Sequence, residues 1–166
     1  MALLGLLLAG CGVGEAAAPP AGSIGTATVV RVIDGDTVEL SIGGVTERAR
    51  LLGIDAPESV SPKVPDQCFG AEASQALHDL LPPGAGVRVE RDAESRDRYG
   101  RLLLYLYRSD DGLFVNQWML ESGLADAMAF EPNTTFALPF EAARSQAEAA
   151  GTGLWGRCDG PDQPLE

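Results

Sequence analysis

Basic residues are scarce in this chain of 166 residues: 12 Lys and Arg stand against 24 Asp and Glu, which gives a formal net charge of −12. Only one of the basic residues, Lys63, is a lysine. An acidic protein repels polyanions at long range, so composition alone argues against a nucleic-acid partner. That argument holds only until a local cationic site is found.

Histidine and cysteine are also rare, with one His and three Cys in the chain. These residues provide too few ligands for a zinc site. The single histidine, His78, lies on a predicted helix and has no evident catalytic partner. If Cys11 belongs to an export signal, Cys68 and Cys158 remain, and in an oxidising compartment they can form one disulfide. Two buried thiols are the alternative.

The N-terminal apolar run, "MALLGLLLAGC", is too short to span a bilayer as a stable helix. Its length is typical of the hydrophobic region of a secretory signal. The end of the run, Leu8-Ala9-Gly10-Cys11, matches a bacterial lipobox and predicts lipidation at Cys11. An ordinary signal peptide cleaved near residues 16–18 is the alternative, and no Lys or Arg precedes the run. We therefore expect an extracytoplasmic protein, tethered to the membrane as a lipoprotein or secreted.

The sequence after the signal peptide (residues 1–11) predicts one folded domain between two terminal segments. Residues 12–25 are small and rich in Pro and Gly, which is typical of a flexible tether, although a disordered N-terminus has the same composition. Apolar residues make up 45% of the chain, so residues 26–158 can bury a single core. Residues 159–166 form a C-terminal tail. We expect a monomer.

Hydrophobic periodicity predicts five strands and three helices. The expected strands cover residues 26–33, 37–42, 45–54, 87–92 and 101–108, and the expected helices lie around 73–80, at 115–122 and at 138–150. Gly43-Gly44 provides a two-residue hairpin turn, and Pro82-Pro83 stops the first helix. Five short strands, with one helix between the third and fourth, predict an α+β fold: a five-stranded barrel of the oligonucleotide-binding (OB) type with three α-helices packed on it.

Two acidic residues, Asp34 and Asp36, flank a glycine where the second expected strand begins. Asp-Gly pairs often mark nothing more than a turn. Hairpin pairing, however, brings Asp36 towards Asp55 at the end of the third expected strand. Partly buried carboxylates need a cation, and hard cations such as Ca²⁺ bind several carboxylate oxygens. A calcium site is therefore the second interpretation of this pair.

Six stretches of the sequence together carry a family resemblance. They are "IDGDTVEL", "RARLLGIDAPE", "FGAEAS", "DRYGRLLLYLY", "VNQWMLESGLA" and "GLWGRC". In this order and at these spacings they resemble the staphylococcal-nuclease (thermonuclease) family over residues 28 to 155. Each stretch alone is weak, but the set is specific. The resemblance implies a calcium-dependent phosphodiesterase on an OB-type barrel, with DNA or RNA as its substrate.

Position by position, the resemblance implies a calcium site. Asp36 and Asp55 would ligate Ca²⁺ through their carboxylates, and Ala56 would ligate it through its backbone carbonyl. Asp34 would lie behind these ligands. The best-known members of the family have threonine in the place of Ala56, so a hydroxyl contact is lost here while the carbonyl remains.

The resemblance also implies three catalytic residues. Glu58 would be the general base that takes a proton from the attacking water. Arg50 and Arg101 would hold the scissile phosphate and stabilise the charge that grows in the transition state, because guanidinium forks match phosphate oxygens. Together with the cation, these arginines would make the cleft of an acidic protein locally positive.

The positions that would contact the nucleotide depart from the family pattern. A pair of tyrosines in the family corresponds to Met128 and Phe130, which weakens the expectation of base stacking. Tyr99 is retained and can contact a base or sugar, and Lys63 either contacts a phosphate or is a solvated loop charge. The alternative functions are a non-catalytic, surface-tethered OB module for an oligonucleotide or an envelope partner, and a calcium-binding structural lipoprotein.

Overall fold

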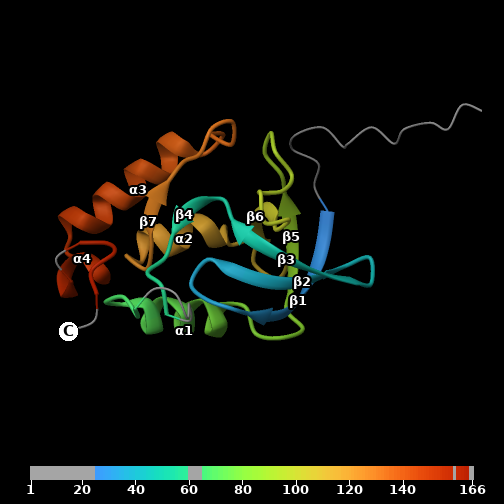
Figure 1. Ribbon diagram of the computed structural model, residues 1–166, viewed down its shortest axis with the longest axis horizontal. Helices are drawn as coiled ribbons and strands as arrows, with labels where there is room; N and C mark the ends of the chain where they lie inside the picture. Colours follow the sequence, from blue (N-terminus) through green and yellow to red (C-terminus); the bar gives the residue numbers. More distant parts are fainter. Residues whose placement is uncertain (1–24, 60–64, 159, 165–166) are drawn as a thin grey trace, which may run out of the picture.

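The computed structural model describes residues 25–59, 65–158 and 160–164, which form a β-barrel with helices beside it (Figure 1). The strands are β1 (Gly25–Val32), β2 (Thr37–Ile42), β3 (Val45–Leu51), β4 (Gly53–Asp55), β5 (Gly86–Glu90), β6 (Leu102–Arg108) and β7 (Asp126–Met128). The helices are α1 (Gly70–Leu80), α2 (Val115–Glu121), α3 (Ala137–Ala149) and α4 (Leu154–Arg157). Cys11, Lys63, the signal peptide and the tether up to residue 24 lie outside the described residues.

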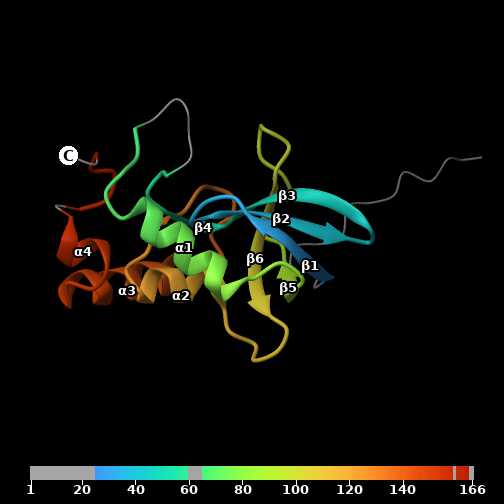
Figure 2. The ribbon, with the colours of Figure 1, turned by 90° about the horizontal axis from the view of Figure 1, so that it is seen from below.

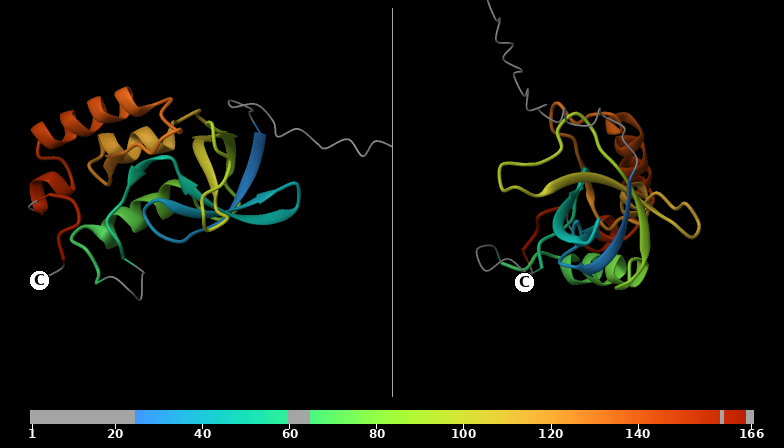
Figure 3. Two further views of the ribbon diagram at one scale, coloured as in Figure 1. Left: turned by 45° about the horizontal axis from the view of Figure 1, so that its top comes forward. Right: turned by 90° about the vertical axis from the view of Figure 1, so that its right-hand side faces the viewer.

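Five strands close into a barrel in the order β1-β2-β3-β6-β5, which Figure 3 shows from two further sides. All neighbouring strands in this order are antiparallel except β3 and β6, which are parallel. The hairpin turn lies at Gly43 and Gly44, whose φ angles of 59° and 84° suit glycine. Alternate residues of β2, Val38 and Leu40, are fully buried in the core. The predicted α+β fold with a five-stranded OB-type barrel is confirmed.

The prediction of one continuous strand over residues 45–54 is wrong. Gly53 has φ of 76°, and a Cβ added to it would lie 2.5 Å from the Phe140 ring. The strand therefore leaves the barrel here, and β4 pairs with β7 as a separate two-stranded sheet. The buried side chain of Asn116 donates to the carbonyl of Leu52 at 2.8 Å and so satisfies the backbone at the break.

The three predicted helices are present as α1, α2 and α3, and α4 adds a single turn. Helices α2 and α3 pack on each other at the end of the barrel where β4 and β7 lie, and α1 lies against β1 (Figures 1 and 2). Four aromatic rings with centroids 4.6 to 6.1 Å apart fill the space between β6 and the helices: Tyr105, Phe114, Phe136 and Phe140. None of the helices in the described ranges is both long and apolar enough to cross a membrane.

The end of the chain folds back towards α1. Cys68, just before α1, and Cys158, just after α4, form a disulfide with their Cα atoms 6.1 Å apart. Residues 160–164, which the sequence assigns to a tail, lie beside this bridge: the Cys68 amide donates to the carbonyl of Gln163 at 2.7 Å, and Gln67 forms an antiparallel bridge with Pro164.

Candidate active site

The loop between β1 and β2 holds Asp34 and Asp36 in a fixed orientation. Asp36 is buried, with 7% of its surface exposed. Its backbone amide donates to Oδ1 of Asp34 at 3.1 Å, and its own Oδ2 accepts the amide of Ala56 at 3.0 Å. The hydroxyl of Thr37 donates to its other oxygen at 3.0 Å. A Cβ added to Gly35 would lie 2.5 Å from that of Ala56, so only glycine lets the two loops approach this closely.

Arg50 connects the two aspartates that the sequence singles out. Register pairing of Thr37 with Arg50 brings the beginning of β2 next to the end of β3. The guanidinium of Arg50 forms ion pairs with Asp36 and with Asp55, the latter at 2.5 Å, and Nη2 also donates to the carbonyl of Ile54 at 3.1 Å. Asp36 and Asp55 therefore converge, as hairpin pairing predicts.

Burial shifts the pKa values of the groups around Arg50. Desolvation raises the pKa of Asp34 and of Asp55, although the charge of Arg50 lowers both. Desolvation also lowers the pKa of Arg50 itself, against the attraction of Asp55. The raised pKa values of Asp34 and Asp55 disfavour the charged forms of these two carboxyl groups. A cation beside them would favour the charged forms.

One cavity of about 310 Å³ contains most of the predicted site. Its lining residues are Asp34, Asp36, Thr37, Arg50, Asp55, Ala56, Pro57, Glu58, Gln67, Arg101 and Asp162. Of these described residues, five carry carboxylates and two carry guanidinium groups. The cavity thus has more negative than positive charge, and a cation would relieve the imbalance.

The oxygen chemistry of the cavity fits a hard cation. Carboxylate and carbonyl oxygens are the ligands that Ca²⁺ takes, about six to eight at a time. The described residues contain no group of three or more His, Cys, Asp and Glu side chains placed to hold a metal ion. Asp36, Asp55 and the carbonyl of Ala56 fit such an ion in charge and in donor type, but they are too few to complete its coordination, so water or substrate oxygens would have to supply the rest.

Glu58 follows β4 and lines the same cavity. Its carboxylate accepts the amide of Ser59 at 2.9 Å. Its own amide donates to Oε1 of Gln67 at 2.6 Å, and its carbonyl accepts the amide of Gln67 at 2.8 Å. A carboxylate at the wall of a charged cavity can exchange a proton with a water molecule that enters it.

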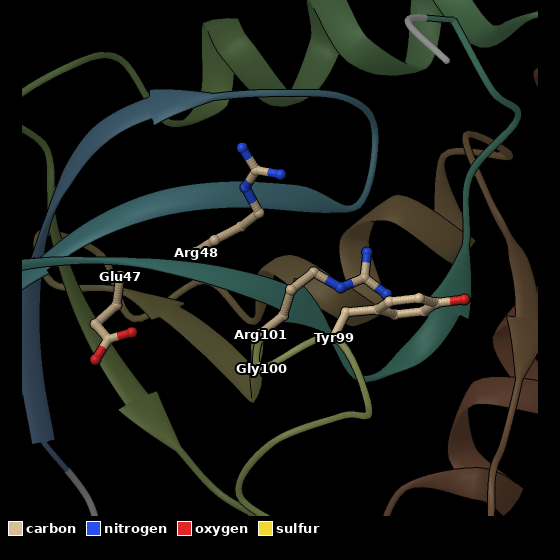
Figure 4. Close-up of a pocket in the computed structure, with 5 residues that line it drawn as sticks. All are labelled: Glu47, Arg48, Tyr99, Gly100 and Arg101. Atoms are coloured by element: carbon tan, nitrogen blue, oxygen red, sulfur yellow. The ribbon is translucent and has the colours of Figure 1, made fainter. Parts of the chain in front are cut away.

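Arg101 comes from the turn that leads into β6. Asp97 holds it by two contacts: Oδ2 accepts Nε of Arg101 at 2.7 Å, and Oδ1 accepts its backbone amide at 2.9 Å. Arg101 also lines a second cavity of about 510 Å³, together with Glu47, Arg48, Tyr99 and Gly100 (Figure 4). The two cavities are therefore adjacent.

The ring of Tyr99 forms an exposed surface in this second cavity, with 69% of the residue accessible. The guanidinium carbons of Arg98 and Arg101 lie 4.8 and 5.6 Å from the ring centroid. In Figure 4 the guanidinium end of Arg101 lies at the near edge of the Tyr99 ring, and Arg48 and Glu47 point to opposite sides of β3. An aromatic face next to cations is the kind of surface on which bases stack.

Two of the other predicted nucleotide contacts, Met128 and Phe130, lie away from the residues that line the two cavities. Met128 lies in β7 opposite Gly53, half-buried, and Phe130 is 66% exposed beyond the end of that strand. Neither lines the two cavities. Their role in binding, like that of Lys63, stays a prediction.

Besides Pro57, sequence reasoning missed three polar residues of the first cavity: Thr37, Gln67 and Asp162. Thr37 belongs to the quoted "IDGDTVEL" stretch, and its hydroxyl could have been assigned from its position next to Asp36. Gln67 and Asp162 are far apart in the sequence. The pairing of Cys68 with Cys158 is the signal that brings these two segments together.

Comparison with known proteins identifies the family of the chain. The family described as "Staphylococcal nuclease homologue" matches residues 48–157. The thermonucleases of Staphylococcus intermedius and Staphylococcus hyicus are 38% and 36% identical over 129 and 130 residues, which is 78% of this chain and 75% of each relative. Endonuclease YncB of Bacillus subtilis (strain 168) is 35% identical over 132 residues, 78% of this chain and 61% of the relative. The chain thus belongs to the staphylococcal nuclease homologue family.

Proposed function

We propose that this chain is a calcium-dependent nuclease that hydrolyses phosphodiester bonds of DNA or RNA. The observation that carries the proposal is the cavity in which Asp36, Asp55 and Glu58 face Arg50 and Arg101. The names of the relatives, thermonuclease and endonuclease, support a nuclease of this kind.

In this proposal, Asp36, Asp55 and the carbonyl of Ala56 hold the Ca²⁺ ion, and Asp34 orients Asp36 through its amide. When bound, the ion polarises a phosphoryl oxygen and makes a neighbouring water more acidic. The five carboxylates of the cavity exceed its two guanidinium groups by three charges, and the ion offsets two of these three. A phosphate can then meet Arg50 and Arg101 despite the net charge of −12.

The residues of the chain divide the chemical work between them. Glu58 takes a proton from the attacking water as the new O–P bond forms and the bond to the leaving oxygen breaks. Arg50 exchanges a carboxylate partner for a phosphate oxygen, and Arg101 approaches the same phosphate from the β6 side. Both guanidinium groups then stabilise the charge on the phosphoryl oxygens.

The second cavity extends the substrate site. Because Arg101 lines both cavities, a nucleotide next to the scissile phosphate reaches Tyr99, where its base or sugar contacts the ring. Met128, Phe130 and Lys63 remain candidates for further contacts with the nucleic acid.

We further propose that the protein is exported and acts outside the cytoplasm as a monomer, anchored through a lipid on Cys11 or secreted. The basis is the apolar N-terminal run and its lipobox-like end. Membrane fractionation of the full chain and of Cys11→Ser distinguishes the two: loss of membrane association in the variant supports the anchor.

The decisive test is hydrolysis of a single-stranded DNA oligonucleotide. We expect turnover with Ca²⁺, none with EGTA, and losses of several orders of magnitude in Glu58→Gln and Arg101→Ala, since each group acts mainly in the transition state. Glu72→Gln, an exposed change on α1, is the control and should retain full activity. Equal rates in all conditions contradict the proposal, and binding without hydrolysis identifies a non-catalytic binding module instead.

A further inference from the structure

The backbone of Glu58 is held by a residue outside the barrel. The amide of Glu58 donates to Oε1 of Gln67 at 2.6 Å, and the amide of Gln67 donates to the carbonyl of Glu58 at 2.8 Å. Both backbone polar groups of Glu58 are thus satisfied by one partner. The direction in which its carboxylate leaves the chain depends on this pair of hydrogen bonds.

Gln67 is in turn held by the end of the chain. Its Nε2 donates to Oδ1 of Asp162 at 3.1 Å, and its backbone forms an antiparallel bridge with Pro164. The next residue, Cys68, is bound to Cys158 by the disulfide, and its amide donates to Gln163 at 2.7 Å. Figure 2 shows the C-terminal segment beside the loop that leads into α1.

The first residue of α1, Gly70, also packs against the backbone of Gln67 and Glu58. The amide of Gly70 donates to the carbonyl of Gln67 at 3.0 Å. A Cβ on Gly70 would lie 2.6 Å from the carbonyl oxygen of Glu58 and 3.1 Å from that of Pro57. Since these neighbours are backbone atoms, the fit leaves little freedom for the loop to move towards the helix.

We propose that Gln67 is a positioning residue for Glu58, and that the disulfide and residues 160–164 hold Gln67 in place. We call Gln67, the Cys68–Cys158 bridge and residues 160–164 the Glu58 clamp. The inference rests on the proposed role of Glu58 as the general base. A base has to lie within hydrogen-bond reach of the water that it deprotonates, and a displacement of about 1 Å at such a site can cost about 100-fold in rate.

The test is a double-mutant cycle between Gln67→Met and Glu58→Gln. Methionine keeps the length of the side chain but neither accepts the Glu58 amide nor donates to Asp162. We expect Gln67→Met to lower kcat by about 10- to 100-fold with little change in KM. In Glu58→Gln the same change should alter kcat by less than about twofold, because no base remains to be positioned. Gln75→Met, on the exposed face of α1, is the matched control and should leave kcat unchanged.

Hydrogen exchange measured by NMR provides a readout that needs no activity. In the unsubstituted chain the amide of Glu58 should be protected, and both Gln67→Met and the double variant Cys68→Ser, Cys158→Ser should accelerate its exchange by about tenfold or more. Unchanged protection in Gln67→Met overturns the clamp. Equal losses of kcat in both backgrounds reduce Gln67 to a structural role and also overturn it. If the unsubstituted chain hydrolyses nothing, the proposed function fails, and the exchange rates alone decide whether the clamp exists.

Discussion

Arg50 has two tasks that compete for the same guanidinium group. In the structure it forms ion pairs with Asp36 and Asp55 and donates to the carbonyl of Ile54. In the proposed reaction it also has to bind a phosphate. Desolvation already lowers its pKa, so an additional anion nearby favours its charged form. Phosphate binding and pairing with the carboxylates therefore both require the forked guanidinium group of Arg50.

The variant Arg50→Lys keeps the charge but removes the fork. A lysine ammonium lacks the planar fork that holds a carboxylate and a phosphate oxygen side by side, so we expect kcat/KM for single-stranded DNA to fall by about 100-fold or more. Arg108→Lys is the matched control, because Arg108 pairs with Asp110 and neither residue is among those that line the two cavities. A loss of only a few-fold in Arg50→Lys would mean that charge alone is sufficient at this position.

Asp92 shows how a single buried carboxylate links several elements. It follows β5, accepts the hydroxyl of Tyr105 in β6 at 2.7 Å, and accepts both the amide and the hydroxyl of Thr135, ahead of α3, at 3.0 and 2.9 Å. Burial raises the pKa of Asp92, but these hydrogen bonds and the one from Ala93 outweigh it and hold the pKa below its ordinary value. The charged form therefore stabilises the packing of α3 on the barrel.

At the scale of these elements, we expect Asp92→Asn to lower the free energy of unfolding by about 1 to 3 kcal/mol at pH 7. Because the folded pKa is depressed, the advantage of the carboxylate exists above the unfolded pKa of about 3.9 and disappears as the pH falls through the lower, folded value. Urea unfolding at pH 7 and near pH 3 measures both. The exposed Asp79→Asn should have the same free energy of unfolding as the unsubstituted chain at either pH. An equal loss of unfolding free energy in Asp92→Asn at both pH values would contradict the charge argument.

The elements that local sequence determines could be predicted, and those that depend on distant contacts could not. The Gly43-Gly44 turn and the alternation in β2 are local, so the approach of Asp36 to Asp55 followed from the sequence. The break before β4 depends on the ring of Phe140 against Gly53, and β7 is too short to have a pattern of its own. The residues near Gly53 therefore carry no local pattern that predicts the break, and those of β7 carry none that predicts a strand.

The same division applies to the whole molecule. Most residues of the candidate site lie on β2, β3 or β4 or close to a strand end, so the family-like spacing allowed them to be named from the sequence. Gln67 and Asp162 come together only through the return of the chain end and the disulfide. The sequence allowed either a disulfide or two buried thiols. Without knowing which, nothing in the sequence places residues 159–166 near the site, so they can only be assigned to a tail.

Net charge sets the last expectation, which concerns the salt dependence of activity. A chain of charge −12 repels a polyanion beyond about a Debye length, about 10 Å at 0.1 M salt. Binding then depends on the arginines at the two cavities: Arg48, Arg50, Arg98 and Arg101. On single strands each phosphate contact contributes about −0.7 to the slope of log K against log salt. Four such contacts limit the slope to about −3, and screening of the net repulsion makes it shallower.

The measurement is kcat/KM for a single-stranded oligonucleotide from 50 to 200 mM salt, about the range over which such slopes are taken, at fixed Ca²⁺. A slope steeper than about −3 would require more phosphate contacts than these arginines can make, and the substrate path would then have to extend beyond both cavities.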